Sequence, residues 1–517
     1  MAFMRKSDKE FVEEVFRKSE IKIEIERQKK SWFKKVIVSV AAASIVLMVT
    51  VLPWQMLGPE LWPGSNGNAE VEGEHIAGTE SVQGTEVIPD TEENPEIESN
   101  PGTGPEQNTE VFPSVKYEYR PLSTSSISLM DGVVSQEVER RELSEAFLNN
   151  QMNLAVKLFQ ESNRADSGKN TLISPLSIQL ALAMTANGAK GETRAEMEQL
   201  LGGDIPLEEL NQYLKAYVKS LPSGWDYKLN IANSIWFRDH ERLTVEQDFL
   251  QLNADYYGAE VYKSPFDNQT VKDMNQWVSN ETDGMIDHIV SQIDDYKVMY
   301  LINALLFDAK WQDIYTKGSV KEATFTTLDG QKQQIELMHS EESIYLENDN
   351  VIGFMKPYQN MEYSFVALLP KEEGNAALQS FVENLTAEEI QELIQNQEKY
   401  VLVKSSLPKF SYEYEFDLKE ALKALGMKQV FDSQCADLSG LGTSAWGNIY
   451  VSQVNHKAVI EVAELGTRAA AVTIVEDTIE SEAFKIYEVY LDRPFVYMII
   501  DNHTNLPIFI GTLTSVE

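Results

Sequence analysis

The sequence predicts an α+β fold, and three segments support that prediction. Apolar and polar side chains alternate over residues 455–462, which is typical of a half-buried strand. Residues 175–184 are nearly all apolar and follow Ser174, a good N-cap, with Pro175 at the first helical position, so they predict a buried helix. Residues 301–311 are rich in apolar side chains and predict a largely buried strand.

Length and composition limit the possible functions. The chain has 517 residues, enough for one large domain with extensions or for two or three domains. Its formal net charge of -37 argues against nucleic acids and other polyanions as partners. A single cysteine, Cys435, excludes an intramolecular disulfide, and we expect it to be a small hydrophobe near a surface loop rather than a reactive thiol.

The N-terminal region predicts a membrane anchor. No charged residue occurs between Lys35 and Glu60, and the apolar span 36–57 can cross a bilayer, which needs about 20 residues. Several lysines precede this span and none follows before Lys116, so residues 1–35 are expected to be a cytoplasmic tail. A cleaved signal peptide is the alternative, but the charged stretch is longer than usual and no small-x-small cleavage site follows. We therefore expect a single-pass protein of the cell membrane with its main domain outside the cell.

A stalk and a folded domain follow the anchor. Residues 58–125 are rich in Gly, Pro, Glu, Asn and Thr, a composition that cannot repay chain entropy, and they predict a disordered acidic stalk. The folded domain is assigned to 126–517. Within it, an amphipathic helix is predicted over 143–159 and a short strand over 233–237. Near the C-terminus, two apolar strands flank a hairpin turn at 502–505.

The sequence offers no constellation for catalysis. None of the six histidines stands in a His-x-x-x-His or His-Glu-x-x-His spacing. There is also no Gly-x-Ser-x-Gly nucleophile elbow, phosphate-binding glycine loop or Cys-x-x-Cys pair. We therefore expect a protein that is not an enzyme, with no metal and no cofactor.

A series of short motifs runs across the whole domain. They are Asn170-x-x-x-Ser-Pro175, Gly188-Ala-x-Gly-x-Thr193, Asn275-x-Trp-Val278, Leu407-Pro-Lys-Phe410, Glu464-x-Gly-Thr467 and Arg493-Pro-Phe495. The series resembles the serpin family of serine protease inhibitors, and the motifs occur in the family's order, which argues against chance. The resemblance implies a central large mixed β-sheet, two further sheets, about nine helices and an exposed reactive-centre loop, in a chain that is expected to be a monomer.

The segment after residue 463 resembles the serpin hinge, which enters the central sheet as a new strand. After Gly466, every second residue up to Thr473 has a small, uncharged side chain. No proline occurs in this stretch, so every backbone N–H can donate a hydrogen bond. The hinge residues carried over from the family are Glu464, Gly466, Thr467, Ala469, Ala470, Ala471 and Thr473. Where this chain has Arg468, the family usually has an acidic residue. In an inserted strand the Arg468 side chain would lie on the opposite face from Thr467, in solvent. In an inserted strand the Asp477 side chain would lie on the same, buried face as Thr467. It would therefore have to lie near the solvent-exposed end of the sheet.

The family's usual spacing places the reactive bond between Glu480 and Ser481. The surrounding acidic loop disfavours trypsin-like targets, whose specificity pocket is acidic, so a glutamyl-preferring serine protease is the expected partner. Two alternatives stay open because loop lengths vary among serpins. A subtilisin-like enzyme would cut after Ile479, and an aspartate-specific cysteine protease after Asp477.

The resemblance also implies two polar clusters that control the sheet. Ser174, Ser177, Asn303 and His456 are expected to meet under the region where the central sheet opens. Lys409 is expected to pair with Glu464 at the top of the sheet, where Trp311 packs; solvated surface charges are the alternative for this pair.

These expectations define one principal function and two alternatives. The principal function is that of a membrane-tethered protease inhibitor, as in a bacterial cell-surface protein, which acts as a suicide substrate through insertion of its reactive loop. The first alternative is a non-inhibitory serpin that serves as a surface binding or structural protein. Such relatives often carry bulky, charged or proline residues in the hinge, whereas this hinge is mostly small. The second is the ectodomain of a signalling receptor.

Overall fold

The computed structural model describes residues 117–139, 141–224, 226–240, 243–294, 297–445, 447–467 and 485–516. All of them belong to the second of two compact units, which comprises residues 110–517. The predicted tail, anchor and most of the stalk lie outside the described residues. Within the described ranges, no helix is both long enough and apolar enough to cross a membrane.

The described part of the chain contains nine α-helices. They are α2 (Glu145–Ala165), α3 (Pro175–Ala186), α4 (Gly191–Leu201), α5 (Leu207–Ser220), α6 (Gln247–Tyr257), α7 (Asn268–Glu281), α8 (Asn375–Asn384), α9 (Ala387–Gln395) and α10 (Lys419–Ala424). Every residue of α3 is buried, as its uniformly apolar sequence predicts. The helix begins as expected, because the Ser174 hydroxyl caps the Ser177 N–H and Pro175 occupies the first turn.

Seven strands form a sheet that we call the central sheet. Their order is β1 (Ile127–Ser128), β5 (Glu260–Ser264), β3 (Tyr227–Arg238), β6 (Met299–Lys310), β15 (Gly466–Thr467), β14 (Asn455–Ala463) and β12 (Phe410–Asp417). The sheet is mixed, because β3 and β5 are parallel whereas the other neighbours are antiparallel. The strands predicted over 233–237, 301–311 and 455–462 are confirmed as β3, β6 and β14.

A second sheet has nine strands and a third has two. The nine-stranded sheet has the order β16 (Ile486–Tyr490), β11 (Glu398–Pro408), β8 (Lys332–Glu347), β9 (Val351–Pro357), β10 (Tyr363–Pro370), β17 (Phe495–Asp501), β18 (Pro507–Leu513) and β2 (Thr171–Ile173), with β7 (Val320–Thr326) also paired to β8. The small sheet pairs β13 (Gly442–Ser444) with β4 (Leu243–Val245). The α+β class, the mixed central sheet and the two further sheets are thus confirmed. Every residue of β17 and β18 is buried, as their apolar sequences predict.

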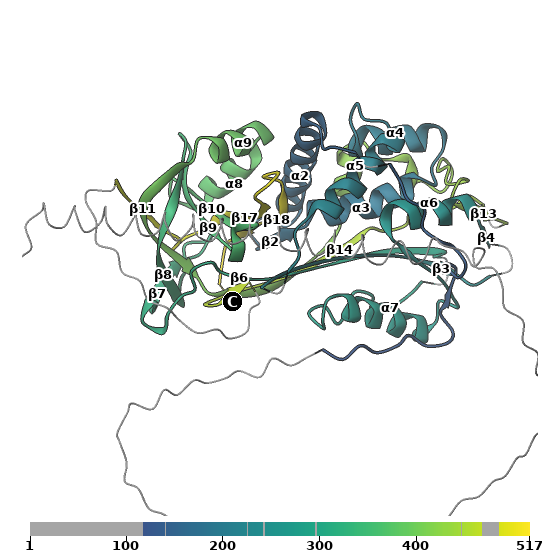
Figure 1. The fold of residues 1–517 in the computed structure, drawn as a ribbon, viewed down its shortest axis with the longest axis horizontal. Coiled ribbons are helices and arrows are strands. Elements are labelled where there is room, and N and C mark those ends of the chain that lie inside the picture. The colour runs from purple at the N-terminus through teal and green to yellow at the C-terminus, as the bar shows by residue number, and fades with distance from the viewer. Residues whose placement is uncertain are drawn as a thin grey trace, which may run out of the picture. The chain divides into compact units, whose positions relative to one another are not determined.

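Helices cover both faces of the central sheet. Figure 1 shows α3, α5 and α6 above it and α7 below it. On the side of α7, a separate hydrophobic cluster joins Met274 and Trp277 of this helix to Trp236 of β3 and Ile302 of β6. This cover reaches β3 and β6, whereas β12 and β14 alternate buried with more exposed residues, so their second face is only partly covered.

The packed region reaches beyond the predicted domain start at residue 126. The Tyr117 hydroxyl lies 3.0 Å from the Ser279 hydroxyl and 3.0 Å from the Asn280 side-chain carbonyl oxygen on α7, within hydrogen-bond distance of both. The backbone N–H of Ser123 donates to Asp273 at 3.0 Å. This part of the predicted stalk therefore contacts α7, because its polar side chains find partners on that helix.

Candidate functional site

The hinge enters the central sheet between two strands that run in the same direction. After β14 the chain turns at Glu464 and Leu465, and β15 then pairs antiparallel with both β14 and β6. Thr467 lies opposite Val462 on one side and Ala309 on the other. Since β15 is antiparallel to each neighbour, β6 and β14 are parallel to one another (Figure 1). Thr467 is the last described residue before residue 485. It thus occupies a strand position at one end of the gap between β6 and β14.

Gly466 is required by the close approach of β6. A Cβ atom at this position would lie 2.1 Å from the carbonyl oxygen of Ala309. No side chain fits at that distance from a backbone atom, so the hinge glycine is fixed by the strand spacing.

Thr467 is tied to an aromatic stack under the hinge. Its hydroxyl lies 2.6 Å from the hydroxyl of Tyr358, and both residues are buried. The Tyr358 ring stacks on Trp311 with 4.4 Å between the ring centres. Burial raises the pKa of the Tyr358 phenol well above its usual value, so the group stays neutral. Tyr358 was not predicted from the sequence, because no local pattern identifies the long-range partner of a tyrosine.

Trp311 holds the turn that precedes the hinge. Its indole N–H donates to the carbonyl of Ala463 and its backbone N–H to that of Leu465, both at 2.9 Å. The N–H of Tyr315 donates to the Glu464 carbonyl at 2.9 Å. The structure therefore places Trp311 at the top of the sheet, against the carbonyls of the turn.

Lys409 forms ion pairs on the exposed side of the same turn. Its ammonium lies 3.0 Å from the Glu464 carboxylate and 3.4 Å from that of Glu336. Burial alone would lower the pKa of Lys409, but hydrogen bonding and the charges of the two carboxylates raise it above its ordinary value. About a third of each side chain in the Lys409–Glu464 pair is exposed, so we expect a contribution of about 0.2–1 kcal/mol.

A second ion pair, which the sequence analysis missed, is buried nearby. Lys356 lies 2.8 Å from Glu342, and both side chains are almost fully buried. The Lys356 ammonium also lies 4.4 Å from the centre of the Tyr315 ring. Burial opposes the charge, but Glu342 and Tyr315 raise the pKa of Lys356 above its ordinary value. A charge within the apolar strand β9 was the only signal in the sequence.

The four residues expected under the opening region form two branches that meet at the start of α3. The N–H of Ser174 donates to Nε2 of His456 on β14 at 3.2 Å. The hydroxyl of Ser177 donates to the Asn303 carbonyl oxygen on β6. Ser177 N–H in turn donates to the Ser174 hydroxyl at 3.4 Å. The start of α3 therefore connects the two strands that flank the hinge.

Two features complete this cluster. The amide of Asn303 donates to the Asn233 carbonyl oxygen at 2.5 Å, which extends the network to β3. Asn233 lies directly opposite Asn303 in the register of the two strands, and the sequence analysis did not include it in the cluster. Complete burial lowers the pKa of His456 to about 4. The imidazole is therefore neutral near pH 7, and its Nε2 accepts the Ser174 N–H.

The remaining sequence-derived site residues lie outside the described residues. They are Arg468, Ala469, Ala470, Ala471, Thr473, Asp477, Glu480 and Ser481.

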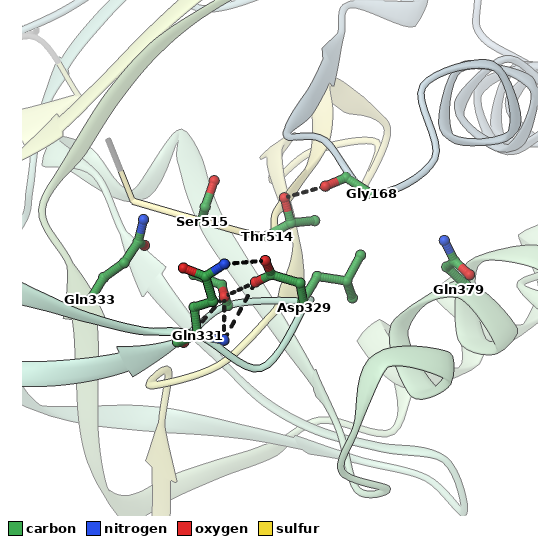
Figure 2. A pocket seen from close by; sticks show the side chains of 9 residues that line it. Gly168, Asp329, Gln331, Gln333, Gln379, Thr514 and Ser515 are labelled. Carbon is green, nitrogen blue, oxygen red and sulfur yellow. Dashed lines mark hydrogen bonds between the residues drawn. The ribbon is translucent and has the colours of Figure 1, made fainter.

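A polar hollow lies elsewhere in the domain. It has a volume of about 420 Å³ and is lined by residues such as Asp329, Gln331 and Gln379 (Figure 2). The amide of Gln331 donates to Asp329 at 2.9 Å, and the hydroxyl of Thr514 donates to the carbonyl of Gly168 at 3.3 Å. These groups already satisfy one another, so the hollow has no evident need for a ligand. In the described part of the chain, no group of three or more His, Cys, Asp or Glu side chains could hold a metal ion.

The mixed sheet with a hinge seated between two parallel strands defines a class of proteins whose central sheet accepts an added strand. Comparison with known proteins identifies the family. The model of the family described as "Serpin (serine protease inhibitor)" matches residues 149–516, and this chain belongs to the serpin family.

Similar proteins match nearly the whole domain. The leukocyte elastase inhibitor of Equus caballus is 29% identical over 376 residues, which are 70% of this chain and 97% of that protein. An uncharacterized serpin-like protein of Thermococcus kodakarensis is 30% identical over 362 residues, 68% of this chain and 81% of that protein. The crystal structure of tengpin, a thermophilic serpin in its native state, matches with a TM-score of 0.72 and 48% identity, covering 76% of this chain and all of that chain.

Proposed function

We propose that this serpin inhibits a protease as a suicide substrate. The nucleophile of the protease attacks the carbonyl carbon of the reactive bond, forming an acyl-enzyme and releasing the new amino terminus of the loop. The freed hinge then continues into the central sheet and carries the attached protease with it. Pairing with β6 and β14 supplies the free energy, because each inserted residue gains backbone hydrogen bonds.

The observation that carries this proposal is the position of β15. Gly466 and Thr467 already pair with both flanking strands, so insertion needs only to extend an existing strand. The next residues on the parity of Thr467 are Ala469, Ala471 and Thr473, whose small side chains suit a sheet covered on both faces.

The links through α3 connect the two strands that flank the hinge. The Ser174 branch reaches β14 and the Ser177 branch reaches β6. Among the described residues, β6 and β14 each pair with β15 and not with one another, so an added strand breaks no direct pairing between them. The cluster therefore holds the two strands at the spacing that an inserted hinge requires.

The finer parts of the proposal rest on the sequence. We place the domain outside the cell, tethered through residues 36–57, because of the uncharged span and the lysines before it. A glutamyl-preferring serine protease is the proposed target, and a subtilisin-like enzyme or a cysteine protease are the alternatives. The acidic loop around Glu480 supports this order of preference.

The test is incubation of the full-length chain with a panel of proteases, followed by denaturing electrophoresis. We expect a covalent complex that survives SDS with at least one glutamyl-preferring or subtilisin-like enzyme. Thr467→Arg should convert the inhibitor into an ordinary substrate, because a charge cannot occupy a sheet position that is 2% exposed, and the start of the hinge would leave the sheet. Thr467→Ser keeps a hydroxyl for Tyr358 and should still form the complex. Cleavage of the loop by every enzyme tested, without any stable complex, would instead favour a non-inhibitory serpin that serves as a surface binding or structural protein.

A further inference from the structure

Three large hydrophobic side chains are exposed at the edge of the nine-stranded sheet. They are Tyr400 of β11, with 84% of its surface exposed, and Ile486 and Tyr490 of β16, with 57% and 38% exposed. We call these three residues the β11–β16 patch. Strand β16 is the edge strand of the sheet and runs parallel to β11. Among the described residues, no neighbouring strand covers its outer edge.

The pairing of the two strands brings Tyr400 and Ile486 close together, whereas Tyr490 lies opposite Ser406 at the other end of β16. Ile486 lies opposite Leu402, only two positions beyond Tyr400, and the N–H of Leu402 donates to the carbonyl of Lys485 at 3.2 Å. Glu398 binds both the Lys485 ammonium, at 2.9 Å, and the Tyr487 hydroxyl, at 2.8 Å. These contacts fix the start of β16 beside the start of β11, so Tyr400 and Ile486 lie at the same end.

Tyr400 adopts a strained backbone conformation, and packing within the domain does not compensate for the strain. Its φ is 61°, in the left-handed region, and the ladder between β11 and β8 shifts register between Lys399 and Val403. A bulky residue in this region is strained, whereas Asn or Gly adopts it readily. The side chain buries little surface within the domain. Stabilisation by packing therefore does not explain a tyrosine here, and contact with a partner does.

The place of the patch along the chain identifies that partner. Ser481, on the leaving side of the expected reactive bond, is five residues before Ile486. Five extended residues span at most about 18 Å. A protease domain of about 220 residues has a radius of gyration of about 17 Å. A protease that binds the reactive bond is therefore large enough to reach the start of β16.

We propose that the β11–β16 patch is an exosite, a secondary surface that the target serine protease contacts while it engages the loop. This proposal rests on the proposed function, because it requires a protease at the loop. Among proteases that share a cleavage preference, the exosite makes the inhibitor selective. It favours an enzyme that has an apolar surface beside its active-site cleft. Tyrosine and isoleucine supply contact area at a small cost in side-chain entropy.

The test compares full-length variants by the rate at which a glutamyl-preferring serine protease consumes the loop. Consumption is followed both as SDS-stable complex and as released C-terminal fragment. We expect Tyr400→Asn combined with Ile486→Ser to reduce the second-order rate constant about tenfold. The cutting of a synthetic peptide with the sequence of residues 468–484 gives the rate that the loop alone supports. Tyr400→Asn alone should slow consumption without lowering the thermal midpoint, because asparagine tolerates the positive φ.

The matched control is Tyr119→Ser. Tyr119 is 68% exposed and lies in the segment that contacts α7, which Figure 1 shows far from β11. This variant should be consumed at the unchanged rate.

The outcomes separate this proposal from the proposed function. If the wild type forms the complex and the double variant forms it equally fast, the exosite is wrong and inhibition stands. If the wild type is cut without forming a stable complex, the proposed inhibition is wrong. The ratio of the rates at which the wild type and the double variant are cut still tests whether the patch contacts the protease. Self-association that the double substitution abolishes would assign the patch to a second copy of this chain. A thermal midpoint lowered by several degrees in Tyr400→Asn would assign it to packing within the chain. Either result overturns the exosite.

Discussion

The buried imidazole of His456 makes the stability of the native state depend on pH. Its pKa is about 4 in the folded protein, against an ordinary value of 6.5. Between these values the unfolded chain binds the proton and the folded chain does not, so this contribution is complete above pH 6.5 and is lost as the pH falls toward 4. We expect the free energy of unfolding to drop by about 2 kcal/mol from this group between pH 7.5 and pH 5.

Denaturant titrations at the two pH values measure this drop. Carboxylates also titrate in this range, so the drop in the free energy of unfolding is compared between wild type and His456→Gln. The amide oxygen of the glutamine can accept the Ser174 N–H. An equally steep pH dependence in both proteins would show that His456 is not responsible.

The residue on the amino side of the reactive bond can be identified directly. We expect the C-terminal fragment released from the inhibited protease to begin at Ser481, because the family's spacing from Gly466 ends at Glu480. Mass spectrometry of the fragment is the measurement. A fragment that begins at Glu480 would indicate cleavage after Ile479 by a subtilisin-like enzyme. One that begins at Thr478 would indicate an aspartate-specific cysteine protease.

At the level of single residues, the sequence identified the positions that a family motif contains and missed the others. Trp311, Lys409 and His456 were expected near the hinge or the opening region, and the structure places them there. Tyr358 and Asn233 were missed because their roles depend on strand register and on contacts between distant segments. Such contacts leave no periodicity in the chain, so local pattern cannot identify them.

Among the elements, the two-residue strand β15 governs what cleavage of the loop should do. It stands at the entrance of a gap between β6 and β14 that a longer strand can fill. Filling the gap adds backbone hydrogen bonds and buries side chains, so cleavage should raise the thermal midpoint by tens of degrees. Calorimetry before and after cutting within residues 468–484 tests this expectation. Equal midpoints would rule out inhibition by insertion.

The elements differ in how well sequence alone predicts them. Helix α3 and strands β17 and β18 were predictable because apolar side chains on all sides leave burial as the only stable arrangement. Residues 466–467 were not, since small side chains suit a loop as well as a strand. Their pairing in the sheet is decided by Gly466, whose lack of a Cβ lets the chain approach Ala309.

On the scale of the whole molecule, we expect residues 36–57 to tether the protein to a membrane. The full-length protein should fractionate with membranes, because residues 36–57 carry no charge and can span a bilayer. External protease should release a soluble domain by cutting within the stalk. Sequencing of the released and retained fragments locates the cut. Intact protein found only in the medium, with an amino terminus beyond Leu57, would show that the segment is a cleaved signal.

The order of strands in the nine-stranded sheet has a consequence for synthesis. Strands β17 and β18, which follow all the other described strands in the chain, lie between β10 and β2, and Ile510 pairs with Ile173. At about 5–20 residues per second, the chain from the end of β10 to the end of β18 takes roughly 7–30 seconds to emerge. During that time β2 and one edge of β10 have no partner. A nascent chain stalled before residue 495 would therefore expose these edges to aggregation, so biogenesis requires that they be shielded until β17 and β18 have emerged.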